Sequence, residues 1–308
     1  VALLYAKNYD RINYEKLKEI ALKFGIFSLI AKIEQYLSGR EYLDVFLPLK
    51  EFDELAQVYH INLSKFRAKR FNITFLEQVG RLLQRKVKVF LIGGGAMVIR
   101  GYKYATKDID LVTINREDTK ELIKVLKEMD YKIIAEDEMI VLENKGPRVD
   151  IYIRVINKKF MVTQQVLKRS EKRELGNLEL YIAHDTDLLI MKALTERARD
   201  YEDVKLLIRR GKIDWKELVR EIENQDKQTG YPVSYSVFSA LELAEKELGI
   251  KIRYKKKLKS IALKSIIRYA YYKLGKKTVK EIQEIIDYPE STIRKKLKEL
   301  LKEDKNPN

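Results

Sequence analysis

The stretch LIGGGAMVIRGYKYATKDIDL, residues 91–111, places three consecutive glycines shortly before an acidic pair, Asp108 and Asp110, that flanks one isoleucine. The run VKVFLI (87–92) that leads into the glycines is typical of a buried strand, and DIDLVTI (108–114) predicts a second strand. In a strand, residues i and i+2 project from the same face. We therefore expect the two carboxylates to point together, with their apolar neighbours on the core side.

A third carboxylate, Asp150, lies in RVDIYIRV (148–155), which also predicts a strand with its apolar residues on one face. If the two acidic strands lie side by side, the three carboxylates converge and repel one another. A hard divalent cation resolves this conflict, because Mg²⁺ prefers carboxylate oxygen. Two such ions about 3.5–4 Å apart can clamp both reacting oxygens of a phosphoryl transfer. Asp108, Asp110 and Asp150 are thus the candidate catalytic residues and ligands for Mg²⁺ or Mn²⁺.

The glycines supply the other half of this predicted site. Gly93 and Gly94 let the backbone turn sharply and approach a ligand closely. A helix is expected at about 95–101, and its first N–H groups and positive dipole end favour phosphate. The turn would hold a nucleoside triphosphate while the aspartates hold its metal ions.

The order strand, Gly-Gly, short helix, D-x-D and a third Asp on a later strand resembles the DNA polymerase β-like nucleotidyltransferase superfamily. Within it, the chain is most similar to the abortive-infection toxin type, which shows a further glycine, here Gly101, and T-x-DIDL, here beginning at Thr106. The similarity covers roughly 86–210. It implies transfer of a nucleoside monophosphate from an NTP to an acceptor hydroxyl, with Asp108 and Asp110 as metal ligands. Asp150 would bind metal or activate the acceptor.

The resemblance also implies a nucleotide-binding set beyond the carboxylates. It consists of Gly93, Gly94, Thr106 and Lys192, and Lys107 joins them as a basic residue beside the predicted site rather than through the resemblance. Lys192, on a predicted helix, would touch the phosphates. The following R-x-x-D-x-x-D, formed by Arg197, Asp200 and Asp203, is interpreted as a salt-bridged helix face in which Asp200 pairs with Lys192.

Composition limits the class of protein. The 308 residues carry a formal charge of +16, which favours nucleic acid as a partner, RNA or DNA. The absence of cysteine excludes disulfides and thiolate metal sites, and only His60 and His184 could offer imidazole. No apolar run reaches the roughly 18 residues of a membrane helix. We expect no membrane association and a cytoplasmic protein, with a composition that leans toward a thermophile.

The pattern of elements predicts an α/β (α+β) fold with a mixed sheet, flanked by helices. An N-terminal helical region covers 1–85, the nucleotidyltransferase domain with its helical extension covers 86–224, and a basic helical domain covers 235–308. The sequence from 161 onward is interpreted as helical throughout.

The C-terminal segment 251–308 holds eighteen Lys or Arg against seven Asp or Glu. Within it, KKTVKEIQEIIDYPESTIRKKLKELL predicts a helix-turn-helix with a small isoleucine and leucine core. Basic residues on the second helix, which would contact nucleic acid, are Arg294, Lys295, Lys296 and Lys298. A basic, solvated helix pair is the alternative.

Together these features predict a metal-dependent nucleotidyltransferase with RNA, tRNA included, as the acceptor. Two alternatives remain open. One is a DNA-binding regulator whose nucleotidyltransferase fold is catalytically silent. The other is a toxin–antitoxin component whose site is masked by a protein partner.

Overall fold

The computed structural model describes residues 2–8, 11–23, 30, 33, 37, 55–61, 73–103, 106, 108–195 and 197–303. The chain divides into two compact units. The first comprises 1–154 and 162–210, and the second comprises 155–161 and 211–308. None of the helices within these described ranges is both long enough and apolar enough to cross a membrane.

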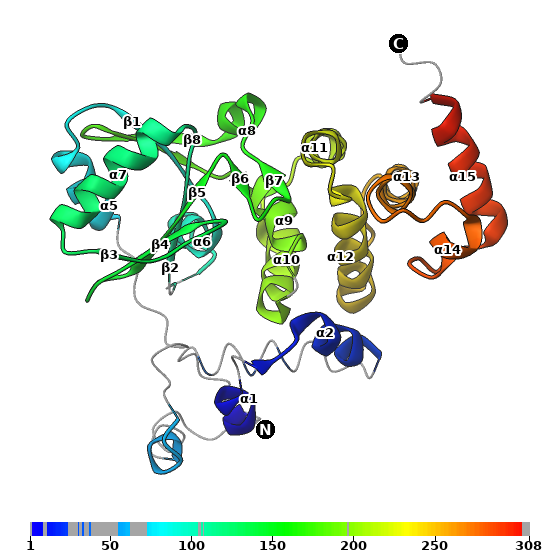
Figure 1. The fold of residues 1–308 in the computed structure, drawn as a ribbon, viewed down its shortest axis with the longest axis horizontal. Helices are drawn as coiled ribbons and strands as arrows, with labels where there is room; N and C mark the ends of the chain where they lie inside the picture. Colours follow the sequence, from blue (N-terminus) through cyan, green and yellow to red (C-terminus); the bar gives the residue numbers. More distant parts are fainter. Residues whose placement is uncertain are drawn as a thin grey trace. The chain divides into compact units, whose positions relative to one another are not determined.

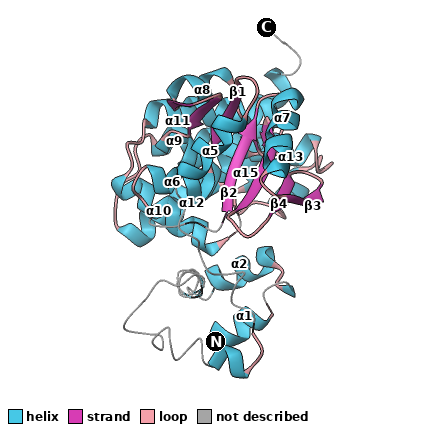
Figure 2. Ribbon diagram, turned by 90° about the vertical axis from the view of Figure 1, so that its left-hand side faces the viewer, coloured by secondary structure: helices cyan, strands magenta, loops and turns pink. Residues whose placement is uncertain are grey.

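The first unit is built around a mixed sheet (Figures 1 and 2). Seven strands of the described chain form it, in the order β3-β4-β5-β2-β1-β9-β8. In chain order they are β1 (Val87–Leu91), β2 (Asp108–Thr113), β3 (Lys132–Glu136), β4 (Ile140–Glu143), β5 (Arg148–Ile153), β8 (Glu171–Leu175) and β9 (Leu178–Ile182). Two pairs are parallel, β1 with β9 and β2 with β5, and the remaining neighbours are antiparallel. The mixed sheet expected from the sequence is therefore present.

Helices cover the two faces of this sheet. Among the described residues, helices of the first unit include α1 (Ala2–Lys7), α2 (Tyr14–Lys23), α5 (Thr74–Leu82), α6 (Gly93–Ile99), α7 (Arg116–Glu128), α8 (Gln164–Arg169), α9 (Asp185–Ala193) and α10 (Ala198–Arg210). Figure 1 shows α5 and α7 on one side of the sheet and α6, α9 and α10 on the other. A buried hydrogen bond of 2.6 Å between the hydroxyls of Thr113 and Thr119 fixes α7 against the face that carries Ile109 and Leu111. The opposite face of β2, which carries Asp108 and Asp110, is therefore the face beside α6.

The helical reading of the chain from 161 onward is wrong for residues 171–182, which form the hairpin β8–β9. Leu178, Leu180 and Ile182 alternate with polar residues and are buried. β9 pairs in parallel with β1 over five residues, so it extends the central sheet rather than a helical layer. The two strands meet at Gly176, whose φ of 61° suits the tight turn.

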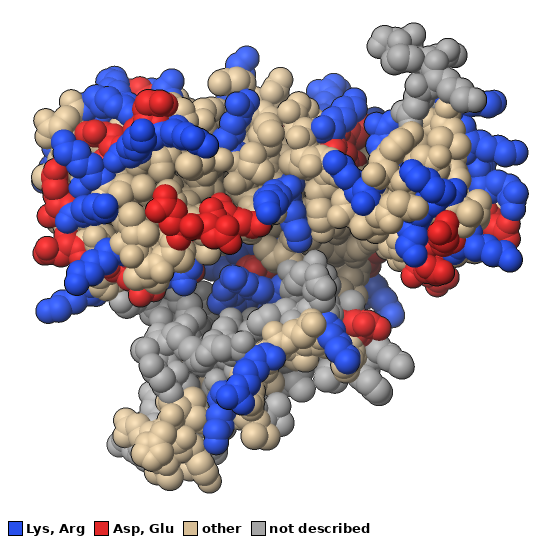
Figure 3. Space-filling model, viewed as in Figure 1, with Lys and Arg blue, Asp and Glu red and all other residues tan. Residues whose placement is uncertain are grey.

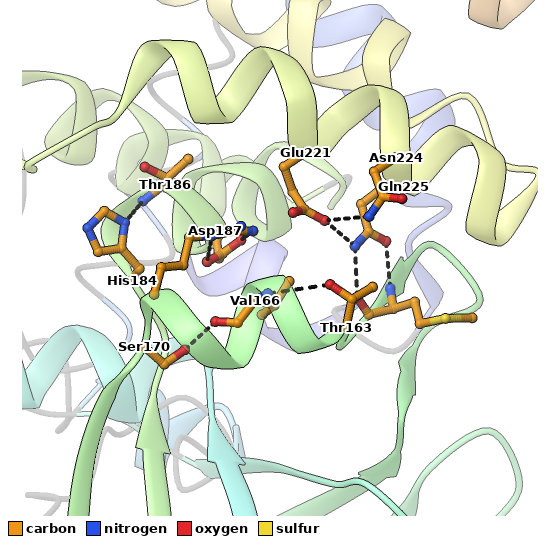
Figure 4. Close-up of polar contacts among 11 residues, drawn as sticks. Thr163, Val166, Ser170, His184, Thr186, Asp187, Glu221, Asn224 and Gln225 are labelled. Atoms are coloured by element: carbon orange, nitrogen blue, oxygen red, sulfur yellow. Dashed lines mark hydrogen bonds and ion pairs between the residues drawn. The ribbon is translucent and has the colours of Figure 1, made fainter.

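Short helix α8 leads into this hairpin, and side chains secure both of its ends. Thr163 caps the first turn by accepting a hydrogen bond from the backbone N–H of Val166, and Ser170 donates to the carbonyl of Val166 (Figure 4). Arg169 makes a two-pronged ion pair with the buried Asp187 at 2.8 and 2.6 Å. This pair joins α8 to the first turn of α9.

The N-terminal helical region of the sequence analysis is described only in part. α1, α2 and α5 are helical, as expected. Most of the predicted helical region between 24 and 72 lies outside the described residues.

The second unit is helical apart from one small hairpin. Its elements are β6 (Val155–Ile156), β7 (Phe160–Met161), α11 (Trp215–Thr229), α12 (Val233–Leu248), α13 (Lys255–Tyr272), α14 (Val279–Gln283) and α15 (Glu290–Glu303). The side-chain amide of Gln225 on α11 holds the hairpin through two hydrogen bonds to the backbone of Met161. It accepts from the Met161 N–H at 2.7 Å and donates to the Met161 carbonyl at 2.8 Å. Glu221, one turn earlier, accepts from Gln225 and Asn224 (Figure 4).

The C-terminal helix pair expected from the sequence is present. Thr278 and Glu281 form a capping box that begins α14, and α15 begins directly after Pro289. The small core packs against α13 and contains, as expected, Ile282, Ile286, Ile293, Leu297 and Leu300, with Ile285 partly buried beside it. Figure 3 shows Lys and Arg side chains gathered over the C-terminal helix, at the right of the view.

Candidate functional site

Strands β2 and β5 bring the acidic residues together. They pair in parallel with Asp110 opposite Asp150 and Asp108 opposite Arg148, so all four side chains project from one face of the sheet. Asp150 is buried, and Asp108 and Asp110 are half-buried. The two strands lie side by side, as expected from the sequence. Their register places two of the three carboxylates, Asp110 and Asp150, directly opposite each other.

The glycine turn is close to the same face because β1 pairs with β2 on its other side. The N–H of Ile92 donates to the carbonyl of Asp110 at 3.1 Å, and the next residue, Gly93, begins α6. A Cβ on Gly93 would lie 2.1 Å from Oδ2 of Asp110, and the φ of 60° also favours glycine. A glycine stands here because the Asp110 carboxylate rests directly against the backbone of the turn.

Thr106 and Gly94 form a second close contact beside the first. A Cβ on Gly94 would lie 2.1 Å from the Thr106 hydroxyl oxygen. That buried hydroxyl donates to the backbone carbonyl of Asp108 at 3.1 Å and lies 3.4 Å from its carboxylate. Thr106 therefore fixes the start of β2 against the turn, and its hydroxyl also reaches the first carboxylate. Lys107, the other candidate in this stretch, lies outside the described residues.

The clustered carboxylates disfavour one another's ionisation. Burial raises the pKa of Asp110 to about 8, and the charges of Asp108 and Asp150 act in the same direction. Burial also raises the pKa of Asp150, although the Arg148 guanidinium opposes this. Without an added positive charge, Asp110 is therefore mostly protonated at neutral pH.

Arg148 is a site residue that the sequence argument missed. Its Nε and Nη2 donate to the two carboxylate oxygens of Asp150 at 2.7 and 3.0 Å, a two-pronged ion pair. The Arg148 side chain remains 38% exposed while that of Asp150 is 6% exposed. The signal in the sequence was the i, i+2 spacing in R-V-D, which places both side chains on one face.

The donor set suits a hard divalent cation only in part. Among the described residues, no group of three or more acidic or histidine side chains is arranged to hold a metal ion. Asp108 and Asp110 lie two residues apart on one strand face, and the raised pKa of Asp110 marks a charge conflict that a cation would relieve. Asp150 is held by Arg148 instead. In this arrangement Asp108 and Asp110 are the two carboxylates left to face a cation, while Asp150 is paired with Arg148.

Lys192 belongs to a buried ionic cluster between α9, α10 and the loop after α6. Its ammonium pairs with Asp200 and, at 3.0 Å, with Asp203. Lys103 pairs with the same Asp203 at 2.5 Å. Burial lowers the pKa of Lys192, but the two carboxylates outweigh it and raise that pKa overall. The pairing of Lys192 with Asp200, expected for a salt-bridged face, is present.

The same cluster lies close enough to the site to act on it electrostatically. The positive charges of Lys192 and Arg197 both lower the pKa of Asp110, against the larger effect of burial. Arg197 also lowers the pKa of Asp150, and its side chain is exposed. Arg197 is thus an exposed cation whose charge influences both Asp110 and Asp150, an effect that its interpretation as a helix-face residue did not anticipate.

The loop that carries Lys103 is fixed by a second polar contact. The Tyr102 hydroxyl donates to the buried Asp185 at 2.6 Å, and Arg100 lies 3.4 Å from the same carboxylate. Arg100 also donates to the backbone carbonyl of Ala183 at 2.6 Å. The end of α6 is therefore tied to the start of α9, which holds the glycine turn in place.

The nucleic-acid candidates lie on α15 in the second unit. Arg294 pairs with Glu290 on the same helix, and Lys296 pairs with Glu299 at 2.7 Å. Lys295 and Lys298 are exposed. All four residues lie on one helix but differ in their partners. Lys295 and Lys298 offer the more accessible charges.

A family model described as "Nucleotidyltransferase of unknown function (DUF6036)" matches residues 73–248, which is more than half of the chain. No curated protein matches the chain. Two solved structures are similar at low identity. The solution structure of antibiotic-resistance factor ANT(2'')-Ia is 14% identical, with 66% of this chain and 95% of that chain covered and a TM-score of 0.34. A nucleotidyltransferase-like antigenic protein from Paracoccidioides brasiliensis is 16% identical, with 61% and 90% covered and a TM-score of 0.33. Structural similarity at these scores carries no argument about this chain.

Proposed function

The chain belongs to the family of nucleotidyltransferases of unknown function (DUF6036), and from this membership we propose that it transfers a nucleoside monophosphate from an NTP to an acceptor hydroxyl. One structural observation supports assigning this reaction to particular residues. Asp110 lies opposite Asp150 on paired strands, with Asp108 on the same face and the Gly93 backbone in contact with Asp110. In this reaction the acceptor oxygen attacks the α-phosphorus, the bond to the β-phosphate oxygen breaks, and pyrophosphate leaves.

Each residue of the site has a role that its surroundings support. Asp108 and Asp110 would hold the divalent cation, Mg²⁺ or Mn²⁺, and Asp150 would complete the set or accept the proton of the acceptor hydroxyl. When bound, such a cation neutralises charge on the triphosphate and on the leaving pyrophosphate. Gly93 and Gly94 keep the turn free of side chains where the phosphates would approach. 

Positive side chains flank the carboxylates on the α10 side. Arg197 is exposed and acts on Asp110 and Asp150, so it is the best-placed group to pair with the triphosphate. Lys192 is engaged by two carboxylates, and we assign it to holding α9 and α10 at the site and supplying positive potential there. Its direct contact with phosphate, expected from the resemblance, would require release from Asp200 and Asp203.

RNA, tRNA included, is our proposed acceptor, and the charge distribution supports it. The whole chain carries +16, and the segment 251–308 accounts for eleven of those charges. A polyanionic acceptor gains affinity from such a surface through counterion release. The resemblance to the abortive-infection toxin type adds a proposed cellular role, in which a protein partner masks the site.

The test is label transfer from each α-labelled NTP to total RNA with Mg²⁺ or Mn²⁺. The wild type should label an RNA band with at least one NTP, and Asp108→Asn/Asp110→Asn should not. The labelled band identifies the nucleotide and the acceptor class together. No transfer with any NTP, combined with no cation-dependent NTP binding by calorimetry, would overturn the proposal.

A second candidate rests on the helix pair α14–α15. Its exposed Lys295 and Lys298 and its own small core suit duplex DNA binding by a regulator. This candidate expects sequence-specific duplex binding that survives Asp108→Asn/Asp110→Asn and no nucleotide turnover. Electrophoretic shift of a random duplex library, followed by sequencing of the retained DNA, separates it from the enzyme.

A further inference from the structure

Residues 251–259, KIRYKKKLK, form a basic segment of the second unit that the proposed site does not use. The segment carries six Lys or Arg and no Asp or Glu. It leads into α13, a helix of 18 residues that contains no acidic residue either. Four of its exposed residues are Arg253, Tyr254, Lys256 and Lys257. We call these four the Tyr254 surface.

The backbone that carries Tyr254 is held on both sides. Ile252 and Leu258 are buried, and the carbonyl of Tyr254 accepts the N–H of Leu258 at 2.9 Å. Glu245 on α12 fastens the segment as well, because it accepts the N–H of Ile252 at 2.9 Å and pairs with the ammonium of Lys255. Tyr254 lies between these anchors with a φ of 57°, and 52% of the residue is exposed. The ring is thus presented to solvent from a fixed position.

The four side chains of the Tyr254 surface are not engaged by the part of the chain that the structure describes. Among those residues, no aromatic ring stacks on Tyr254 and no carboxylate pairs with any of the three cations. Two neighbouring lysines differ in this respect. Lys255 pairs with Glu245, and Lys259 lies 5.4 Å from the centre of the Tyr288 ring. The fold therefore uses the other cations of the segment and leaves the Tyr254 surface accessible.

The stability of α13 does not explain its first lysines. Lys256 and Lys257 lie in the first turn of the helix, where there is no acidic residue. Cations in a first turn are unfavourable, because they meet the positive end of the helix dipole. A bound polyanion would offset this repulsion.

We propose that the Tyr254 surface binds single-stranded RNA, with one base stacked on the Tyr254 ring and neighbouring phosphates paired with the three cations. A single strand offers both groups at once, since its unstacked bases are accessible and its backbone is a chain of phosphates. A duplex hides its base faces, and a lipid surface has no planar ring to stack. The choice of RNA over DNA rests on the acceptor proposed above. In that reaction the surface supplies affinity for the acceptor strand and takes no part in the chemistry.

The experiment measures binding apart from the transfer reaction. The full chain is used in EDTA and without NTP. Fluorescence anisotropy follows a labelled, unstructured RNA of about 12 nucleotides, since single-strand sites span about 4–16 nucleotides. The other probes are the same RNA annealed to its complement, DNA of the same sequence, and vesicles of phosphatidylserine and phosphatidylcholine in equal parts.

We expect the Tyr254 ring to matter for the single strand alone. Tyr254→Leu should weaken binding of the single-stranded RNA about fivefold or more, because one stacked base is lost. Tyr254→Phe keeps the ring and should leave this affinity unchanged. Binding of the duplex should be the same in all three proteins. The matched control is Tyr59→Leu, which replaces a tyrosine of the first unit that is 58% exposed and should leave both affinities unchanged.

The salt dependence of binding tests the cations. Lys256→Gln/Lys257→Gln should reduce the slope of log affinity against log salt by about 1.4, because each phosphate contact on a single strand contributes about 0.7. Tyr254→Leu should leave the slope unchanged, since stacking releases no counterions. Lys120→Gln/Lys124→Gln on α7 removes the same charge elsewhere and should reduce the slope less.

Unchanged affinity for the single strand in Tyr254→Leu would overturn the proposal, and so would an equal loss of duplex binding. Vesicle binding that Tyr254→Leu abolishes while RNA binding persists would assign the surface to lipid instead. Tighter binding of the DNA than of the RNA would overturn the choice of RNA. Thermal melting confirms that each variant is folded, and the salt slope of Lys256→Gln/Lys257→Gln keeps the test valid if Tyr254→Leu unfolds. Absence of label transfer beside RNA binding that depends on Tyr254 would contradict only the proposed function.

Discussion

At the scale of single residues, the site is defined by carboxylates that are difficult to ionise together. Asp110 has a pKa of about 8, far above the usual value of about 4 for aspartate. Without a cation, the folded protein therefore binds more protons than the unfolded chain between about pH 4 and pH 8. The metal-free protein should lose stability as the pH rises through this window.

The same shift predicts proton release when a cation binds. A cation needs the ionised carboxylate, so at pH 7 its binding should release close to one proton per chain, and its affinity should rise with pH up to about 8. Calorimetry of Mg²⁺ binding in two buffers of different ionisation enthalpy measures the proton directly. Asp110→Asn should abolish the release, and a cation that binds the wild type without releasing a proton would contradict the prediction.

Substitution of Arg148 should change the stability of the metal-free protein and its affinity for a cation in opposite directions. Arg148→Gln removes the two-pronged partner of the buried Asp150. It should destabilise the metal-free protein by about 1–3 kcal/mol, because a buried acceptor loses its donors, and should raise affinity for Mn²⁺ because Asp150 becomes available. Urea unfolding and Mn²⁺ titration measure the two effects.

The matched control is Arg173→Gln, since Arg173 pairs with Glu171 on an exposed strand surface. Exposed pairs contribute about 0–1 kcal/mol, so this variant should change neither quantity appreciably. Arg148→Gln with unaltered Mn²⁺ affinity would show that the guanidinium does not compete with the cation.

The sequence predicted the acidic residues better than their partners. Strand periodicity is enough to place Asp108, Asp110 and Asp150 on one face, because side chains alternate strictly along strands. It does not reveal that Arg148, opposite Asp108, turns toward Asp150. Nor does it reveal that the charge of Arg197 influences Asp110 and Asp150, because that influence depends on long-range packing of the chain.

At the scale of elements, the turn between β1 and α6 can be tested with two glycines. Gly93 has a φ of 60° and its Cβ would strike Asp110 at 2.1 Å, whereas Gly101 has a φ of 75° with nothing within 4 Å of its Cβ. Alanine at either position costs about 1–2 kcal/mol for the left-handed backbone. Only Gly93→Ala displaces a carboxylate, and a displacement near 1 Å can cost about 100-fold in rate.

We therefore expect thermal melting to show similar destabilisation in the two variants. Transfer rates should differ, with Gly101→Ala close to wild type and Gly93→Ala reduced about 100-fold or more. Equal loss of transfer in both variants would mean that the turn matters only for folding.

The hairpin β8–β9 shows where element prediction failed and why. Its strands contain many charged residues, and the sequence around them continues a pattern of helices on both sides. The evidence for β9 was the alternation of Leu178, Leu180 and Ile182 after Gly176. Its place beside β1 is a long-range pairing that no local pattern encodes. The helices α14 and α15, in contrast, are indicated by local signals, the Thr278–Glu281 capping box and the spacing of their isoleucines and leucines, and both are present.

At the scale of the whole molecule, the candidate catalytic carboxylates and the basic helix α15 lie in different units. The carboxylates lie in the first unit, while α15 and its basic residues lie in the second. If α15 contacts nucleic acid, neutralising it should weaken binding without altering the carboxylate site. Lys295→Gln/Lys298→Gln should reduce the slope of log affinity against log salt by about 1–2, since each phosphate contact contributes about 0.7–0.9.

Filter binding of RNA at several salt concentrations measures this slope. Lys120→Gln/Lys124→Gln, which neutralises two exposed lysines on α7 of the first unit, is the control and should leave the slope closer to that of the wild type. Equal reductions in both variants would indicate that RNA binding follows net charge rather than α15.

We propose that Asp108, Asp110 and Asp150 catalyse nucleotidyl transfer, and a label-position experiment tests this. The protein, Mg²⁺ and total RNA are supplied with the same NTP labelled at either the α- or the γ-phosphate. We expect RNA to acquire the α-label only. Asp108→Asn and Asp110→Asn should each reduce this labelling by about 1,000-fold or more if their charge acts in the transition state, whereas Asp137→Asn, outside the cluster, should not. Transfer of the γ-label, or α-label transfer that survives both site variants, would rule out this role for the aspartates.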